Sequence, residues 1–218
     1  MNSPLIQLLV LAAIAVFLIL RLKNVLGTRE GFEKPPLPTP PAQRSGPAFE
    51  VIEGGPDLDI TDHFDEGTAQ ARALAEMKRI EPSFNVTDFL AGGRGAYEMI
   101  VMGYETGELD EIKSFLSEDI YESFVDGVAA REDQGLTIEA NFIGVREMSL
   151  ENVTLDPDTK EAEMTLRFVA ELTQAVRNSE GEIVEGSLTD AKKQKDTWVF
   201  SRHMGSDDPN WFLVSTDG

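Results

Sequence analysis

The stretch from Glu161 to Leu172, EAEMTLRFVAEL, decides the fold of this chain. Apolar and polar side chains alternate along it without interruption, with Ala162, Met164, Leu166, Phe168, Ala170 and Leu172 set against Glu161, Glu163, Thr165, Arg167 and Glu171. Since successive side chains of a β-strand point to opposite faces, this alternation predicts a long strand with one buried face.

Similar but shorter patterns lie on both sides of this strand. Leu136, Ile138, Ala140 and Phe142 alternate, and Ile143 and Val145 then continue on the other parity, which predicts a bulge. A turn at Ser179 to Gly181 precedes a strand over Lys195 to Arg202, and Trp211 to Ser215 forms the last strand. The second half of the chain is therefore expected to be an antiparallel sheet.

Helical patterns precede the strands. Asn85 can cap a helix that continues to Gly107, Leu109 to Leu116 indicates a short second helix, and Ser117 caps a third that ends near Gly135. Helices followed by antiparallel strands predict an α+β domain over residues 83–218, with N-terminal helices packed on a curved antiparallel sheet.

Residues 24–82 are expected to be a linker. Its proline-rich part, Pro35 to Pro41, favours extended polyproline II geometry, and Phe49 to Glu66 is acidic, poor in large apolar residues and expected to be disordered. A short amphipathic helix near residues 67–81 carries Ala71, Leu74, Met77 and Ile80 at helical spacing. It needs a surface to dock on, either this domain or a partner.

An apolar run from Leu5 to Leu20 predicts a transmembrane anchor over residues 1–23. A helix from Ser3 to Leu22 would be about 30 Å long, the thickness of one hydrocarbon core. Basic residues follow the run and do not precede it, which favours an uncleaved anchor with the rest of the chain in the cytoplasm. The anchor residues we single out are Leu5, Leu9, Phe17, Leu20, Arg21 and Lys23.

Composition limits the function. The formal net charge of −20 argues against nucleic-acid binding, which needs a cationic footprint. The absence of cysteine excludes disulfides, thiol catalysis and cysteine-ligated zinc. Lys192, Lys193, Lys195 and Arg202 form a basic cluster, which is either a solvated strand face or a contact for an acidic partner.

Few residues suggest a catalytic or ligand-binding role. His203 near Asp207 and Asp208 is the one constellation that resembles a general base, although turn formation at Asp208, Pro209 and Asn210 is the better explanation. Gly92, Gly93 and Gly95 lie inside a helical pattern, so close packing of that helix on the sheet explains them better than phosphate binding. We expect no catalytic residue, no cofactor and no metal site.

Several segments resemble the bacterial relatives of the C-terminal domain of subunit forty-four of the mitochondrial inner-membrane import motor. They are FLAGGRGAYEMIV (89–101), IYESF (120–124) followed by RE (131–132), DTWVFSR (196–202), SDDPNWFLV (206–214) and, after the anchor, RLKNVLGTR (21–29). The resemblance implies a cone-like α+β fold related to nuclear transport factor two and ketosteroid isomerase. It also implies a non-enzymatic adaptor at the bacterial inner membrane that binds a protein partner, with possible contact to anionic lipid.

Three hypotheses follow. The first is a membrane-anchored adaptor in protein translocation or membrane-protein assembly. The second is hydrophobic ligand or lipid binding in a pocket of the cone, for which the candidate lining residues are Tyr97, Phe124, Phe142, Phe168 and Trp198. The third is an enzyme of the ketosteroid-isomerase-like fold that uses His203.

Overall fold

The computed structural model describes residues 57–217. Its helices are α2 (Leu58–Thr61), α3 (Ala69–Ile80), α4 (Val86–Thr106), α5 (Leu109–Ile112) and α6 (Glu118–Glu132), with a 3₁₀ turn η1 (Lys113–Phe115). Four strands follow: β1 (Thr137–Leu155), β2 (Glu161–Arg177), β3 (Ile183–His203) and β4 (Phe212–Asp217). The predicted order of helices before strands is confirmed.

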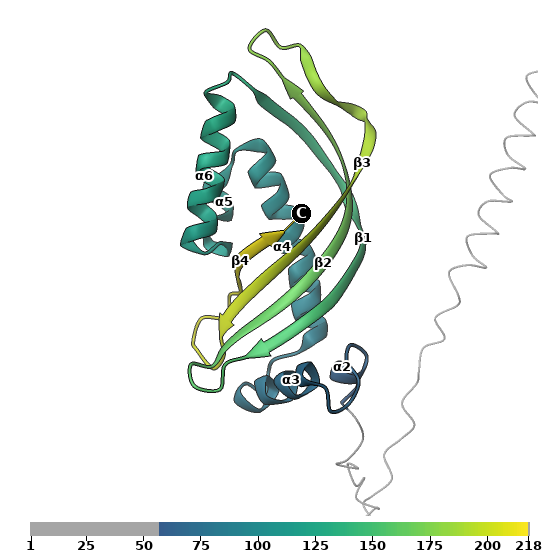
Figure 1. Ribbon diagram of the computed structural model, residues 1–218, viewed down its shortest axis with the longest axis vertical. Coiled ribbons are helices and arrows are strands. Elements are labelled where there is room, and N and C mark those ends of the chain that lie inside the picture. The colour runs from purple at the N-terminus through teal and green to yellow at the C-terminus, as the bar shows by residue number, and fades with distance from the viewer. Residues whose placement is uncertain (1–56, 218) are drawn as a thin grey trace, which may run out of the picture. The chain divides into compact units, whose positions relative to one another are not determined.

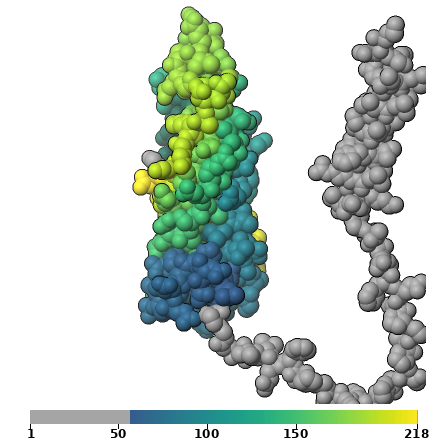
Figure 2. All heavy atoms as spheres, turned by 90° about the vertical axis from the view of Figure 1, so that its right-hand side faces the viewer, coloured from purple at the N-terminus to yellow at the C-terminus, as the bar shows by residue number. Residues whose placement is uncertain are grey.

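The four strands form one antiparallel sheet in chain order, β1-β2-β3-β4. The sheet curves strongly, and α4, α5 and α6 lie on its concave side (Figure 1). Strands β1 to β3 make up most of the opposite face, with α2 and α3 at one end (Figure 2). The predicted α+β class, with helices on one face of a curved sheet, is confirmed.

Strand β2 occupies the centre of the core, as its alternation predicts. Met164, Leu166 and Phe168 are fully buried, and the expected bulge in β1 lies between Phe142 and Gly144. Strands β1, β2 and β3 are longer than the sequence patterns indicate. Strand β1 continues past Val145 beside the first half of β2, whereas the added parts of β2 and β3 pair with each other at the outer end of the sheet. Ile183 and Val184 remain exposed there and give no amphipathic pattern to read.

The helices begin and end where their caps predict. Asn85 accepts a hydrogen bond from the backbone N–H of Asp88 at 3.0 Å, and Gly107 ends α4 with a φ of +81°. Ser117 caps α6, and its own backbone N–H donates to the carbonyl of Leu213 in β4 at 2.9 Å. This bond joins the helical layer to the last strand.

The folded domain begins earlier than residue 83. Leu74 and Met77 of α3 are fully buried in the same core as the sheet, and Ile60 of α2 is 7% exposed. Helix α3 lies against β1, where Gln70 donates to Asn152 at 3.1 Å. The linker is therefore shorter than expected, and the expected disorder over 49–66 is wrong for residues 57–66. The helix near 67–81 docks on its own domain.

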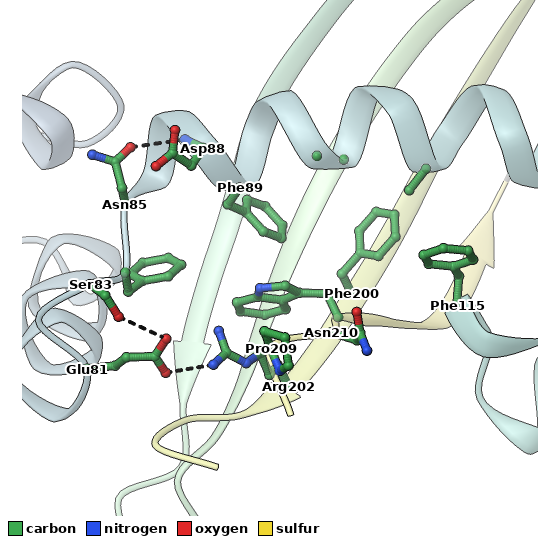
Figure 3. A pocket seen from close by; sticks show the side chains of 15 residues that line it. Glu81, Ser83, Asn85, Asp88, Phe89, Phe115, Phe200, Arg202, Pro209 and Asn210 are labelled. Atoms are coloured by element: carbon green, nitrogen blue, oxygen red, sulfur yellow. Dashed lines mark hydrogen bonds and ion pairs between the residues drawn. The ribbon is translucent and has the colours of Figure 1, made fainter. Parts of the chain in front are cut away.

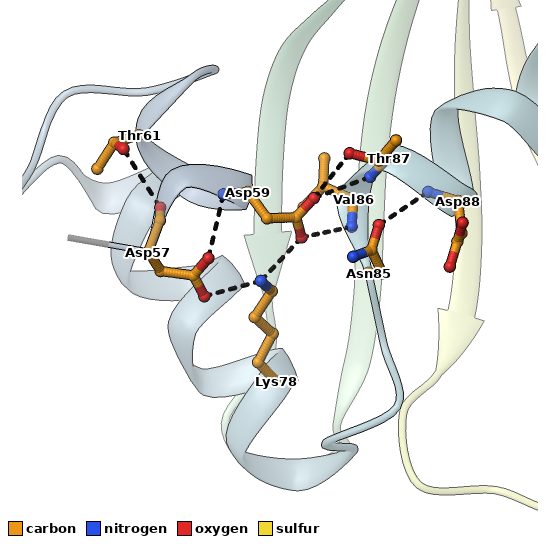
Figure 4. A network of polar contacts seen from close by, with 8 residues as sticks. All are labelled: Asp57, Asp59, Thr61, Lys78, Asn85, Val86, Thr87 and Asp88. Carbon is orange, nitrogen blue, oxygen red and sulfur yellow. Dashed lines mark hydrogen bonds and ion pairs between the residues drawn. The ribbon is translucent and has the colours of Figure 1, made fainter. Parts of the chain in front are cut away.

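A polar network attaches α2 and α3 to the start of α4 (Figure 4). The Lys78 ammonium lies 2.7 Å from the carboxylate of Asp57 and 2.8 Å from that of Asp59. Asp59 also accepts the backbone N–H groups of Val86 at 2.8 Å and Thr87 at 3.0 Å. Partial burial opposes ionisation, yet these donors lower the pKa of Asp59 to about 2. The three helices thus share one network.

The anchor residues Leu5, Leu9, Phe17, Leu20, Arg21 and Lys23 lie outside the described residues, as does the proline-rich segment. Between residues 57 and 217, no helix combines the length and the apolar character that a membrane crossing requires.

Candidate functional site

A groove opens between the first turns of α4 and the loop that joins β3 to β4 (Figure 3). Its volume is about 340 Å³. Five aromatic residues contribute to its lining: Phe84, Phe89, Phe115, Phe200 and Trp211. Polar residues at its rim include Glu81, Ser83, Asn85, Asp88, Arg202 and Asn210. We call this feature the aromatic groove.

The aromatic rings support one another. The centroids of Phe89 and Trp211 lie 4.7 Å apart at an interplanar angle of 61°, and Phe89 meets Phe200 edge to face at 6.2 Å. The centroids of Phe84 and Trp211 lie 6.1 Å apart, with the rings tilted at 45°. Such edge-on pairs are favourable beyond their buried area, so the wall of the groove is preformed.

An ion pair closes one end of the groove. The Arg202 guanidinium lies 2.7 Å from the Glu81 carboxylate, and its Nε donates to the carbonyl oxygen of Asp208 at 3.2 Å. Burial opposes ionisation of Glu81, but Arg202 and the N–H of Gly205 lower its pKa. Since Arg202 is only 7% exposed and already paired, it offers little positive charge to a ligand.

The predicted basic cluster is therefore wrong in one member. Lys192, Lys193 and Lys195 are exposed in the middle of β3, whereas Arg202 is buried next to the last residue of that strand. The strand is long enough to separate residues that are close in sequence, because each residue advances about 3.3 Å.

A second hollow lies on the concave side of the sheet, between α4, α6 and β3, with a volume of about 650 Å³. Of the five predicted pocket residues, Phe124 and Trp198 line it. Tyr97 and Phe168 are fully buried and stack at 4.2 Å, and Phe142 lies 6.1 Å from Tyr97. Three of the five thus belong to the packed core beside the hollow.

Two acidic groups lie at this hollow. The Tyr97 hydroxyl donates to the carboxylate of Asp196, and burial together with this partner raises the pKa of Tyr97. Burial also raises the pKa of Glu105, even though Gln174 donates to it at 2.7 Å and Arg131 and Lys192 attract it. The hollow is thus part apolar and part polar.

The structure does not assemble the constellation around His203. The imidazole is exposed at the end of β3 and forms no hydrogen bond within residues 57–217. Asp208 accepts the N–H of Asn210 at 2.9 Å, which is the turn role that the sequence favours. Across residues 57–217, no group of three or more potential ligands could hold a metal ion.

The helical glycines have different environments. A Cβ on Gly93 would lie 2.8 Å from Cδ1 of Leu166, so close packing on the sheet explains this glycine. Gly92 and Gly95 are exposed, and a Cβ on either would meet nothing within 4 Å. The packing explanation is wrong for these two.

Sequence reasoning missed the aromatic groove. Its aromatic side chains come from four separate segments, and each is explained within its own segment as an apolar residue of a helix, turn or strand. The available signal was the set of resemblance motifs, since Phe89 and Trp211 fall in two of them. Neither motif indicates that the rings of Phe89 and Trp211 are in contact.

Fold and site together define a helix-backed, curved-sheet domain with an open aromatic groove. A family model described as the Tim44-like domain matches residues 70–218, and the chain belongs to this family. The expected family resemblance is confirmed.

Two further comparisons give more distant matches. The mitochondrial import inner membrane translocase subunit TIM44-1 of Arabidopsis thaliana is 23% identical over 128 residues, which cover 59% of this chain and 27% of that protein. The chain thus spans about a quarter of that relative. The intermembrane space region of the chloroplast protein ARC6 aligns with a TM-score of 0.37 and 14% identity, covering 57% of this chain and 94% of that structure.

Proposed function

We propose that this protein is a membrane-held adaptor whose α+β domain binds a protein partner in protein translocation or membrane-protein assembly. The observation that carries the proposal is the aromatic groove, a preformed apolar surface on a Tim44-like domain. Exposed aromatic patches with polar rims are typical of protein-binding sites. The printed name of the Arabidopsis relative, an import translocase subunit, supports the same class of function.

The membrane part of the proposal rests on the sequence. Residues 1–23 are proposed as a single-pass anchor in a bacterial inner membrane, with the domain on the cytoplasmic side. Residues 24–56 then serve as a spacer, rich in proline between Pro35 and Pro41.

Crosslinking in native membranes tests the adaptor function. The full chain is compared with a variant that lacks Pro4 to Leu22 and with one that lacks residues 67–218. We expect the full chain to capture one or two proteins reproducibly and the variant without residues 67–218 to lose them. Recovery of the same proteins by the full chain and by the variant without residues 67–218 would contradict the proposal.

The concave hollow favours a second candidate function, the binding of a hydrophobic ligand. Its volume of about 650 Å³ falls in the range of small-molecule sites, and Phe124 and Trp198 contribute apolar surface. Native mass spectrometry of the purified chain tests this function. A bound lipid that is lost on Phe124→Asp would support it, whereas a chain without adducts would count against it.

A further inference from the structure

We propose that the aromatic groove binds an extended, proline-containing segment of a partner protein, with a lysine or arginine beside the prolines. This inference rests on the adaptor function proposed above and assigns it to one surface. Four features of the groove support it: a bare stretch of helix, unused hydrogen-bond donors, aromatic planes and an unpaired acidic residue.

The bare stretch of helix is at Gly92. Glycine inside a helix costs roughly 0.5–1 kcal/mol relative to alanine, so it needs a reason. Packing within the domain supplies none, because a Cβ at Gly92 would meet nothing within 4 Å. Gly92 instead lines the groove, where its missing side chain leaves the backbone of α4 open to close approach by another chain.

Three hydrogen-bond donors line the same groove without a partner in residues 57–217. They are the indole N–H of Trp211 and the side-chain amides of Asn85 and Asn210; the oxygen of Asn85 alone is used, for the cap of α4. No buried side-chain nitrogen or oxygen of the described chain lacks a partner, so these donors face solvent. Water satisfies them in the free domain, so an occupant that displaces this water has to offer several accessible acceptors in its place.

An extended peptide supplies such acceptors. A helix uses its carbonyl groups internally, and an acyl chain has none along its length, so neither satisfies three donors. A polyproline II segment leaves its carbonyls free and is already ordered, and proline-rich ligands of this form dock in aromatic-lined grooves. Phe115 and Trp211, the two partly exposed rings of the lining, offer apolar surface to proline rings above the buried Phe84, Phe89 and Phe200.

The charge at the rim of the groove favours a basic residue beside the prolines of the partner segment. Arg202 is paired with Glu81, whereas Asp88 at the rim is exposed and forms no ion pair within residues 57–217. Together with the net charge of −20, this carboxylate favours a basic residue and disfavours an acidic one.

Fluorescence anisotropy with the full chain in detergent micelles provides the test. The probe is a labelled peptide of about ten residues with a Pro-Pro-Leu-Pro centre and one lysine after it. We expect saturable binding that Gly92→Leu, which fills the groove, weakens at least about tenfold. Gly95→Leu is the matched control: Gly95 lies on the same helix, is equally open and does not line the groove, so binding is retained.

Stability separates this effect from unfolding. Because neither glycine is packed and leucine is the better helix former, both variants should melt no lower than the parent chain. A peptide with glutamate in place of lysine should bind several-fold more weakly. No saturable binding to the parent chain, or equal binding to Gly92→Leu, would overturn the inference.

Two further outcomes are decisive. If serines in place of the prolines in Pro35 to Pro41 tighten probe binding, the groove is occupied by the chain's own segment, and the assignment to a partner is wrong. If Gly92→Leu still captures the crosslinked partner, the adaptor function stands and the groove assignment fails. If the parent chain binds the probe but captures no protein, the adaptor function fails instead.

Discussion

The carboxylate of Asp59 accepts the backbone N–H of Val86 at 2.8 Å, so a residue of α2 caps α4 from 27 positions away in the sequence. Lys78 of α3 holds the same carboxylate at 2.8 Å. One side chain therefore joins three helices, and it satisfies two backbone donors at the start of α4 that have no partner within the helix.

Replacement of Asp59 should loosen this end of the domain. Asp59→Ala removes the cap of α4 and one partner of Lys78, so we expect a loss of about 1–2 kcal/mol in the free energy of unfolding. Chemical denaturation measures it. Asp62→Ala is the control, because Asp62 is exposed and its side chain forms no hydrogen bond within residues 57–217. An equal loss in both variants would refute the capping role.

The same carboxylate should make stability depend on pH. The pKa of Asp59 in the folded chain is about 2, below its ordinary value of 3.8, so folding favours the ionised form. Its contribution is complete above about pH 5 and is lost as the pH falls toward 2. The denaturation curves of Asp59→Asn and the parent chain should therefore converge on acidification. A gap that stays constant from pH 7 to pH 2 would contradict this.

Glu105 should behave in the opposite way. Burial raises its pKa above the ordinary 4.5, so its ionised form opposes folding at neutral pH. Glu105→Gln should raise Tm by about 2 °C at pH 7, and the gain should vanish near pH 4, where the carboxyl is protonated. Glu108→Gln, at an exposed position, should leave Tm unchanged. A gain that persists at pH 4 would point to another cause.

Three glycines of α4 should respond differently to alanine. Gly93→Ala places a methyl group 2.8 Å from the buried Leu166 side chain, and we expect a loss of about 1–3 kcal/mol. Gly92→Ala and Gly95→Ala meet open space and should each gain about 0.5–1 kcal/mol. Thermal melts of the three variants measure these shifts. A similar response at all three positions would argue against the packing described for Gly93.

The buried hydroxyl of Tyr97 should contribute more to the stability of the domain than the hydroxyl of Tyr104. Tyr97→Phe leaves the Asp196 carboxylate, 8% exposed, with only the amide of Gln194 at 3.2 Å, and should cost about 1–3 kcal/mol. The Tyr104 hydroxyl forms no hydrogen bond within residues 57–217, so Tyr104→Phe should stay within about 0.5 kcal/mol of the parent chain. Chemical denaturation of both variants in parallel measures the two changes in the free energy of unfolding.

The sequence predicts the elements better than the contacts between them. Strand β2 and the starts of α4 and α6 follow from local rules, namely strict alternation and the caps Asn85 and Ser117. The docking of α3 depends on a surface that its own residues do not encode, so the sequence left two alternatives open. The contact between Phe89 and Trp211 joins residues far apart in the chain, and no periodicity predicts such a contact.

The bond between Ser117 and Leu213 has a consequence for synthesis of the chain. A ribosome delivers α4, α5 and α6 long before β4, yet η1 and α6 meet the sheet through β4, at the bridge between Leu116 and Leu213. Leu116 and Leu213 are 5% and 0% exposed in the finished domain, so each lacks its cover until the other arrives. The nascent domain therefore stays open along this seam until β4 has left the exit tunnel.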